Sequence, residues 1–175
     1  MNKLTIVING KGGVGKDTLC LSLQNRRVCN VSSITPIKEI AAQHGWNGEK
    51  DLKSRRFLAE LKRVFTEYND LPTRYLIEQH HAFAQSEDEI LFVHIREADQ
   101  IAAFVNGVGG DCLTLLVRRE LPEVAGGYGN RADDDVENYP YDIIFDNNRP
   151  LEQSTAAFAA LIDSLLQDKK DESRE

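Results

Sequence analysis

Cysteine is scarce in this sequence of 175 residues, and it is not arranged as a disulfide framework or a metal site. The three cysteines, Cys20, Cys29 and Cys112, are odd in number and far apart, with no Cys-x-x-Cys pair. This spacing is typical of reduced thiols in a cytoplasmic protein. No apolar run is long enough to span a bilayer, and no signal-peptide pattern opens the chain. We therefore expect a cytoplasmic protein without a membrane partner.

Positive charge is also in short supply. The 21 Lys and Arg residues face 28 Asp and Glu residues, which gives a net charge of −7. General nucleic-acid binding depends on neutralising phosphates, so this balance argues against a nucleic-acid partner but allows a local basic pocket for a small anion. With 41% hydrophobic residues, the chain is expected to form a single domain over residues 1–166, followed by a frayed, charged tail over 167–175.

Glycine, in contrast, is concentrated near the amino end. An apolar run at 4–8 leads into Gly-Lys-Gly-Gly-Val-Gly-Lys-Asp-Thr at 10–18, and a helical pattern follows. This is the strand, glycine loop and helix order of a P-loop, G-x(4)-G-K. Glycine lets backbone N–H groups wrap around a phosphate, and the N-terminus of the helix adds its dipole. The stretch predicts binding of a nucleoside triphosphate, with ATP as co-substrate.

Every residue of this loop is a candidate for binding the phosphates of ATP. The candidates are Gly10, Lys11, Gly12, Gly13, Val14, Gly15, Lys16, Asp17 and Thr18. Lys16 is expected to reach the β- and γ-phosphates and so to be catalytic. The usual motif has Ser or Thr directly after this lysine, where its hydroxyl binds Mg²⁺, whereas this chain has Asp17. We expect Asp17 or Thr18 to hold Mg²⁺; the alternative is that Asp17 only caps the helix.

Downstream of the loop, β-rich runs alternate with helical patterns. Strands are expected at 28–34, 89–95, 112–117 and 141–145, and helices at 17–26, 52–68, 97–105 and 151–166, with two more helices starting at Thr35 and Asp70. Residues 119–140 lack a period and are expected to form a loop that closes as a lid. The alternation predicts an α/β protein with the three-layer P-loop NTPase fold, a mostly parallel sheet, and ligand at the carboxyl ends of its strands.

Arginines follow two of the expected strands. Arg96 comes just after the strand at 89–95, and Arg118 and Arg119 follow the strand at 112–117. Because the carboxyl ends of parallel strands meet on the P-loop side, these side chains can reach a phosphate there. We assign catalytic roles to Arg96, on the transferred phosphoryl group, and to Arg131, brought in by the lid. For Arg118 and Arg119, surface salt bridges are an equal alternative.

A helical region over 35–85 is the expected acceptor side. It carries six cations: Lys53, Arg55, Arg56, Lys62, Arg63 and Arg74. They form a candidate wall for an anionic acceptor, although an ordinary solvated helix face is the alternative for each. Arg74, beside the helix start at Pro72, is the preferred member. His80 and His81 are expected on a helix surface, and His94, at a strand end, either faces the site or packs.

The segment Gly-Lys-Asp-Thr at 15–18 resembles the variant P-loop of phage-type deoxynucleoside monophosphate kinases and of animal-type phosphomevalonate kinases. Fainter likeness continues in Thr-Pro-Ile-Lys-Glu at 35–39 and Arg-Glu-Ala-Asp at 96–99. The resemblance implies a nucleoside monophosphate kinase-like fold, ATP with Mg²⁺, and a phosphorylated acceptor bound by Arg56, Arg74 and Arg96. It implies transfer of the γ-phosphoryl group to a (deoxy)nucleoside monophosphate, or alternatively to phosphomevalonate.

The loop also resembles a second family. Lys-Gly-Gly-Val-Gly-Lys at 11–16 is similar to the signature of partitioning and septum-site ATPases, in which the first lysine reaches across a dimer interface and turnover switches partner binding. Those proteins have Thr-Thr or Ser-Thr after the loop lysine, where this chain has Asp17. They also carry Asp-x-Asp after the second strand, where this chain has Val-Ser-Ser at 31–33. A kinase is favoured; a switch ATPase and a nucleotide-binding module without turnover are the alternatives.

Overall fold

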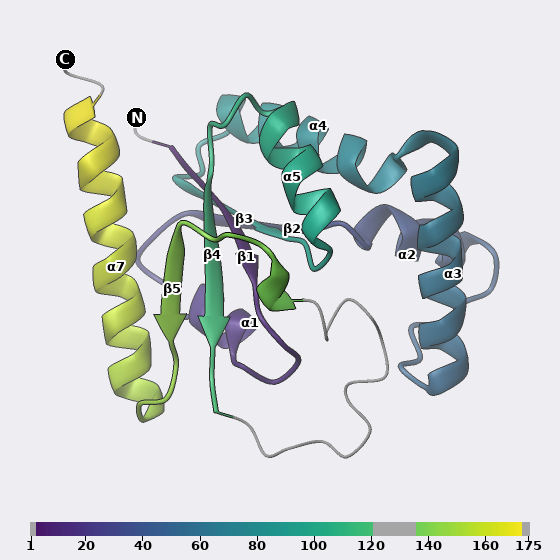
Figure 1. Ribbon diagram of the computed structural model, residues 1–175, viewed down its shortest axis with the longest axis horizontal. Coiled ribbons are helices and arrows are strands. Elements are labelled where there is room, and N and C mark those ends of the chain that lie inside the picture. Colours follow the sequence, from purple (N-terminus) through teal and green to yellow (C-terminus); the bar gives the residue numbers. More distant parts are fainter. Residues whose placement is uncertain (1–2, 121–135, 173–175) are drawn as a thin grey trace.

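The computed structural model describes residues 3–120 and 136–172, and its centre is a five-stranded sheet in the order β2-β3-β1-β4-β5 (Figure 1). The strands are β1 (Leu4–Asn9), β2 (Val28–Ser32), β3 (Ile90–His94), β4 (Leu113–Arg118) and β5 (Ile143–Asp146). All neighbouring strands pair in parallel, so their carboxyl ends meet at one edge. The predicted α/β architecture with a parallel sheet is confirmed.

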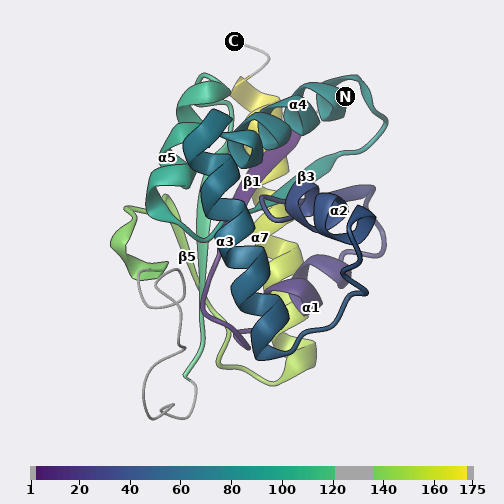
Figure 2. The ribbon, with the colours of Figure 1, turned by 90° about the vertical axis from the view of Figure 1, so that its right-hand side faces the viewer.

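Helices cover both faces of this sheet (Figures 1 and 2). They are α1 (Lys16–Leu21), α2 (Thr35–Gln43), α3 (Leu52–Asn69), α4 (Leu71–Gln85), α5 (Ala98–Gly107), the 3-10 helix η1 (Val136–Asn138) and α7 (Leu151–Glu172). The three layers follow from the alternation of side chains along each strand. Ile90 and Phe92 pack in one core with residues of α1 and α7, whereas Leu91 and Val93 pack in a second core with residues of α4 and α5.

A smaller core joins α2 to α3 at the side of the sheet. Ile37 and Ala41 of α2 meet Leu58 of α3, and Trp46 packs against them from the intervening loop. Asp51 caps α3 by accepting a hydrogen bond from the backbone N–H of Ser54 at 2.7 Å. α3 then runs from the level of α1 to the start of α4 (Figures 1 and 2). Within the helical region at 35–85, α2 and α3 therefore stand together beside the sheet, whereas α4 packs on its face.

The structure corrects two sequence predictions about the periphery. Residues 167–172 continue α7 instead of fraying, because the Lys169 ammonium contacts the Asp111 carboxylate at 2.7 Å. His80 is buried, 8% exposed, with Nδ1 3.2 Å from the Thr5 hydroxyl, so it does not lie on the helix surface as expected. α1 is also shorter than predicted: it ends at Leu21, and turns follow.

Most of the expected lid at 119–140 lies outside the described residues; its last part forms η1. Among the described residues, no helix combines the length and apolar character needed to cross a membrane.

Candidate active site

Residues 10–15 form the loop between β1 and α1, the phosphate loop, and the ammonium of Lys16 closes this loop into a ring. Gly10, Gly13 and Gly15 have φ values of 151°, 83° and 93°, which side chains rarely allow. The Lys16 ammonium donates to the backbone carbonyls of Gly10, at 2.6 Å, and Lys11, at 3.2 Å. The charge of Lys16 is therefore held over the loop, where a phosphate group would meet it.

At two of these positions, neighbouring atoms also leave no room for a side chain. A Cβ at Gly10 would lie 2.5 Å from the carbonyl oxygen of Val117 in β4, and a Cβ at Gly15 would lie 2.7 Å from the side-chain nitrogen of Asn147. The loop is thus wedged against the ends of β4 and β5. Its remaining members, Gly12 and Val14, complete the contiguous stretch that the motif predicted.

Asp17 and Thr18 follow Lys16 in the first turn of α1, and both side chains are exposed. His94, the last residue of β3, lies near this turn. Burial lowers the pKa of His94 below its ordinary value; the carboxylate of Asp17 opposes this shift and the ammonium of Lys16 adds to it. His94 Nε2 also lies 3.1 Å from Oδ1 of Asn30. His94 therefore lies half-buried at the carboxyl end of β3, on the side of the first turn of α1.

Arg96 lies two residues beyond the end of β3, the strand next to β1, so the topology brings it to the edge that holds the phosphate loop. Its side chain is exposed, and its carbonyl oxygen accepts a hydrogen bond of 3.0 Å from the side chain of Asn9. The next residue, Glu97, accepts two hydrogen bonds of 2.7 Å from Lys62 of α3. This ion pair ties α3 to the segment that carries Arg96.

The other predicted acceptor residues make no described contact with the segment that carries Arg96. Arg56 precedes Lys62 by six residues, which turns its side chain by about 120° from the side that meets Glu97. Arg55 precedes Lys62 by seven residues and shares its side. Arg74 is exposed in the first turn of α4, at the far end of α3 from α1 (Figure 2). Arg131 lies outside the described residues.

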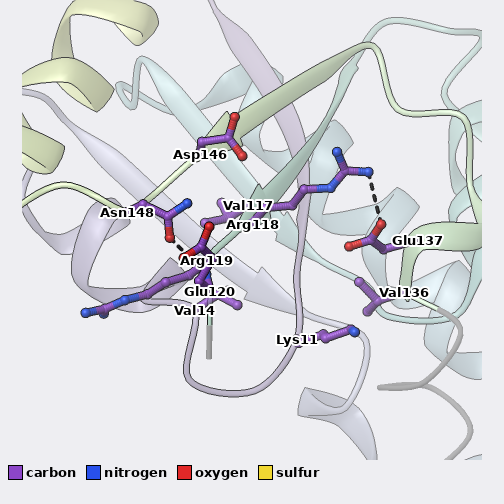
Figure 3. Close-up of a pocket in the computed structure, with 10 residues that line it drawn as sticks. All are labelled: Lys11, Val14, Val117, Arg118, Arg119, Glu120, Val136, Glu137, Asp146 and Asn148. Carbon is purple, nitrogen blue, oxygen red and sulfur yellow. Dashed lines mark hydrogen bonds and ion pairs between the residues drawn. The ribbon is translucent and has the colours of Figure 1, made fainter. Parts of the chain in front are cut away.

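A cavity of about 250 Å³ opens beside the phosphate loop, between the ends of β4 and β5 (Figure 3). It is lined by Lys11, Val14, Val117, Arg118, Arg119, Glu120, Val136, Glu137, Asp146 and Asn148. Arg118 and Glu137 point toward one another and form an ion pair at 3.0 Å, whereas Arg119 extends to the opposite side (Figure 3). Both arginines therefore line this cavity, and the charge of Arg118 is paired with that of Glu137.

Three residues at the site were not predicted as site residues from the sequence: Asn9, Tyr141 and Asn147. Asn147 donates from its side chain to the carbonyl of Val14, at 2.7 Å. Asn9 accepts from the amide of Gly10 and donates to Tyr141, at 2.8 and 2.7 Å. A polar residue directly before the first glycine, and one directly after a strand, are the signals that could have drawn attention to Asn9 and Asn147.

No family model matches this sequence, and no curated protein matches it. Solved structures do. The tunicamycin resistance protein of Deinococcus radiodurans superposes with a TM-score of 0.58 at 14% identity, over 92% of this chain and 96% of that one. A gluconokinase from Sinorhizobium meliloti gives 0.56 at 12%, over 97% of each chain. A sugar kinase from Janibacter gives 0.54 at 15%, over 92% and 95%.

This chain has the three-layer P-loop NTPase fold. The predicted fold class is thereby confirmed, and the phosphate loop described above lies where that fold places its P-loop, between the first strand and the first helix. At these identities the likeness concerns the fold and not the substrate.

Proposed function

We propose that this protein transfers the γ-phosphoryl group of ATP to a small acceptor. The observation that carries the proposal is the closed phosphate loop, in which Lys16 already rests on the carbonyls of Gly10 and Lys11. A triphosphate would replace these carbonyls as the partner of the ammonium group. Phosphoryl transfer asks the protein mainly for positioning and for cations near the transferred group, and Arg96 follows the adjacent strand to supply one.

Asp17 and Thr18 fit the Mg²⁺ that accompanies ATP in such reactions, because both carry hard oxygen donors in the turn that follows Lys16. In the described part of the chain, no group of three His, Cys, Asp or Glu side chains could hold a metal by itself. The ion would therefore take its other ligands from phosphate oxygens and water. When bound, it would neutralise charge on the phosphates.

The cavity beside the loop is the candidate site for the nucleoside part of ATP. Lys11 and Val14 bring it into contact with the phosphate loop. The cations of its lining, Lys11, Arg118 and Arg119, are matched by Glu120, Glu137 and Asp146, and such a balanced lining suits an uncharged nucleoside. Its position between the ends of β4 and β5 leaves the opposite side, toward β3 and α3, for the acceptor. Donor and acceptor would then meet over Lys16.

For the acceptor we propose a phosphate group, with a (deoxy)nucleoside monophosphate as the first choice and phosphomevalonate as the alternative. A hydroxyl acceptor needs a base, whereas a phosphate is already ionised at neutral pH. Next to Arg96, the carboxylate of Glu97 is occupied by two hydrogen bonds from Lys62 and offers a poor base. Arg96 and Arg55 present exposed cations on this side, whereas Lys62 is paired with Glu97; Arg56 and Arg74 stay predicted acceptor residues.

A switch ATPase acting through a protein partner is the second candidate, because of Lys11. In this structure Lys11 lines the cavity of its own chain, which supports a role in binding its own nucleotide (Figure 3). The two functions differ in what stimulates turnover.

The test is ADP formation from ATP and Mg²⁺ across a panel of nucleoside monophosphates and phosphomevalonate. A kinase gives ADP that depends on one acceptor, with the matching diphosphate as second product. Lys16→Ala should reduce this rate by about 10³-fold or more while the fold remains, and Lys170→Ala, exposed on α7, should not. ADP formed without any acceptor on the panel, or an undiminished rate in Lys16→Ala, would contradict the proposal.

A further inference from the structure

Asn9, at the end of β1, has every polar atom of its side chain engaged although it is completely buried. Its Oδ1 accepts from the backbone amide of Gly10 at 2.8 Å. Its Nδ2 donates to the carbonyl of Arg96 at 3.0 Å and to the hydroxyl of Tyr141 at 2.7 Å. A backbone N–H can only donate and a backbone carbonyl can only accept. The N–H of Gly10 and the carbonyl of Arg96 therefore fix which side-chain atom of Asn9 is the oxygen and which is the nitrogen.

Tyr141 extends this network to the wall of the cavity. Its hydroxyl donates to the carbonyl of Val136 at 2.7 Å, and Val136 begins η1 and lines the cavity together with Glu137. Burial raises the pKa of Tyr141 to about 12, so its hydroxyl keeps the proton that this bond requires. The ring of Tyr139 packs edge-on against the ring of Tyr141, with the centroids 5.2 Å apart.

The network therefore joins three parts of the site: the first amide of the phosphate loop, the backbone of Arg96, and the cavity wall at Val136. We propose that Asn9 and Tyr141 are positioning residues, which transmit nucleotide binding in the loop and cavity to the position of Arg96. A buried network whose members are all satisfied is rigid, so a shift at one end is carried to the others. The inference rests on the proposed function for its catalytic consequence and on nucleotide binding alone for its structural one.

The physical step is short. A nucleotide in the cavity would contact Val136, whose carbonyl holds the Tyr141 hydroxyl, and its phosphates would lie against the loop that begins at Gly10. Both paths lead to the Asn9 side chain. Because Asn9 also donates to the carbonyl of Arg96, a shift of Asn9 moves the segment that carries the guanidinium. Tyr141→Phe removes one hydroxyl and leaves the packing with Tyr139 in place. Asn9→Asp keeps the acceptor for Gly10 but removes the donor to Arg96.

The first measurement is steady-state kinetics with the acceptor that wild type uses best. Tyr141→Phe should lower kcat about fivefold to tenfold, with KM for ATP changed less than about twofold, since the two hydrogen bonds that are lost, with Asn9 and Val136, lie away from the phosphates. Asn9→Asp should lower kcat by at least about tenfold. Tyr139→Phe is the matched control and should behave as wild type. A loss in Tyr141→Phe that is equal in the control would overturn the proposal.

The second measurement needs no acceptor. Backbone hydrogen exchange of the peptide at 95–101 is followed with and without Mg²⁺ and the ATP analogue AMP-PNP. Wild type and Tyr139→Phe should show slower exchange there when the analogue binds, and Tyr141→Phe should show less than half of this protection. Equal protection in all three, or none in wild type, overturns the proposal. Wild type that shows this pattern but no acceptor-dependent ADP would contradict the kinase function and leave the coupling standing.

Discussion

Asn147 and Val14 lie 133 positions apart in the sequence, and the side-chain nitrogen of Asn147 donates to the carbonyl of Val14 at 2.7 Å in a buried environment. Asn147 directly follows β5, and its backbone amide also donates to the carbonyl of Arg118 at 2.7 Å. One residue thus braces the phosphate loop against the last two strands. This brace suits a loop that must hold its amides in one arrangement while empty.

Asn147→Ala should weaken both the fold and the loop. It leaves the buried carbonyl of Val14 without a donor, which should lower the free energy of unfolding by about 1–3 kcal/mol and reduce affinity for Mg²⁺·ATP. Asn106→Ala, at the exposed end of α5, is the control and should change stability by less than about 0.5 kcal/mol. Urea denaturation and calorimetry of AMP-PNP binding measure the two effects. Unchanged nucleotide affinity in Asn147→Ala would argue against the brace.

Gly10→Ala should be among the most damaging single changes in the chain. The new Cβ would lie 2.5 Å from the Val117 carbonyl oxygen and 2.9 Å from a methyl carbon of Val14, at a φ of 151°. The backbone of Val117 and the side chain of Val14 must both move, so we expect a loss of about 3 kcal/mol in unfolding free energy.

Gly48→Ala separates the two causes of this loss. Gly48 has a φ of 91°, and no atom lies within 4 Å of the place that a Cβ would take there, so only backbone strain of about 1 kcal/mol applies. Urea denaturation of both variants gives the comparison. Equal losses would mean that crowding against β4 does not matter at Gly10.

Lys62 and Glu97 should be coupled more strongly than an ordinary surface pair. Their side chains are 12% and 30% exposed, and two hydrogen bonds of 2.7 Å join them. A double-mutant cycle with Lys62→Met and Glu97→Gln should give a coupling energy above about 1 kcal/mol. Arg63 and Glu67, one helical turn apart and both more than half exposed, are the matched pair and should give less than about 0.5 kcal/mol. Similar coupling in both cycles would remove the special tie between α3 and the Arg96 segment.

The features that the sequence predicted well are local ones. The motif at 10–18 spans the turn from β1 into α1, as its strand, loop and helix order predicts, and both elements follow from periods of two and 3.6 residues. The contact between Asn9 and Tyr141 could not be predicted in this way, because 132 positions separate the two residues and no local sequence pattern indicates that they meet. The end of α7 was predicted wrongly for the same reason. Its charges indicate fraying, and the partner of Lys169, Asp111, lies far away in the sequence, in the loop between α5 and β4.

His80 makes stability depend on pH, and the sign follows from its burial. Its pKa lies below the ordinary value of 6.5, first because burial disfavours the charged form. Asp111, with Oδ2 3.9 Å from Nε2, raises the pKa, and the charges of His81 and Lys169 lower it, so burial prevails. Between the folded and unfolded pKa values, the unfolded chain binds more protons. The free energy of unfolding therefore falls as the pH drops below about 6.5, and levels off above it.

Urea denaturation at about pH 7.5 and about pH 5.5 measures this slope. Wild type should be less stable at the lower pH. His80→Gln should lose part of the difference, because His94, whose pKa burial also lowers, contributes the remainder with the same sign. His81→Gln, changed at the neighbouring exposed position, should keep nearly the wild-type difference. If His80→Gln retains the full wild-type difference, the buried His80 is not the group whose protonation opposes folding.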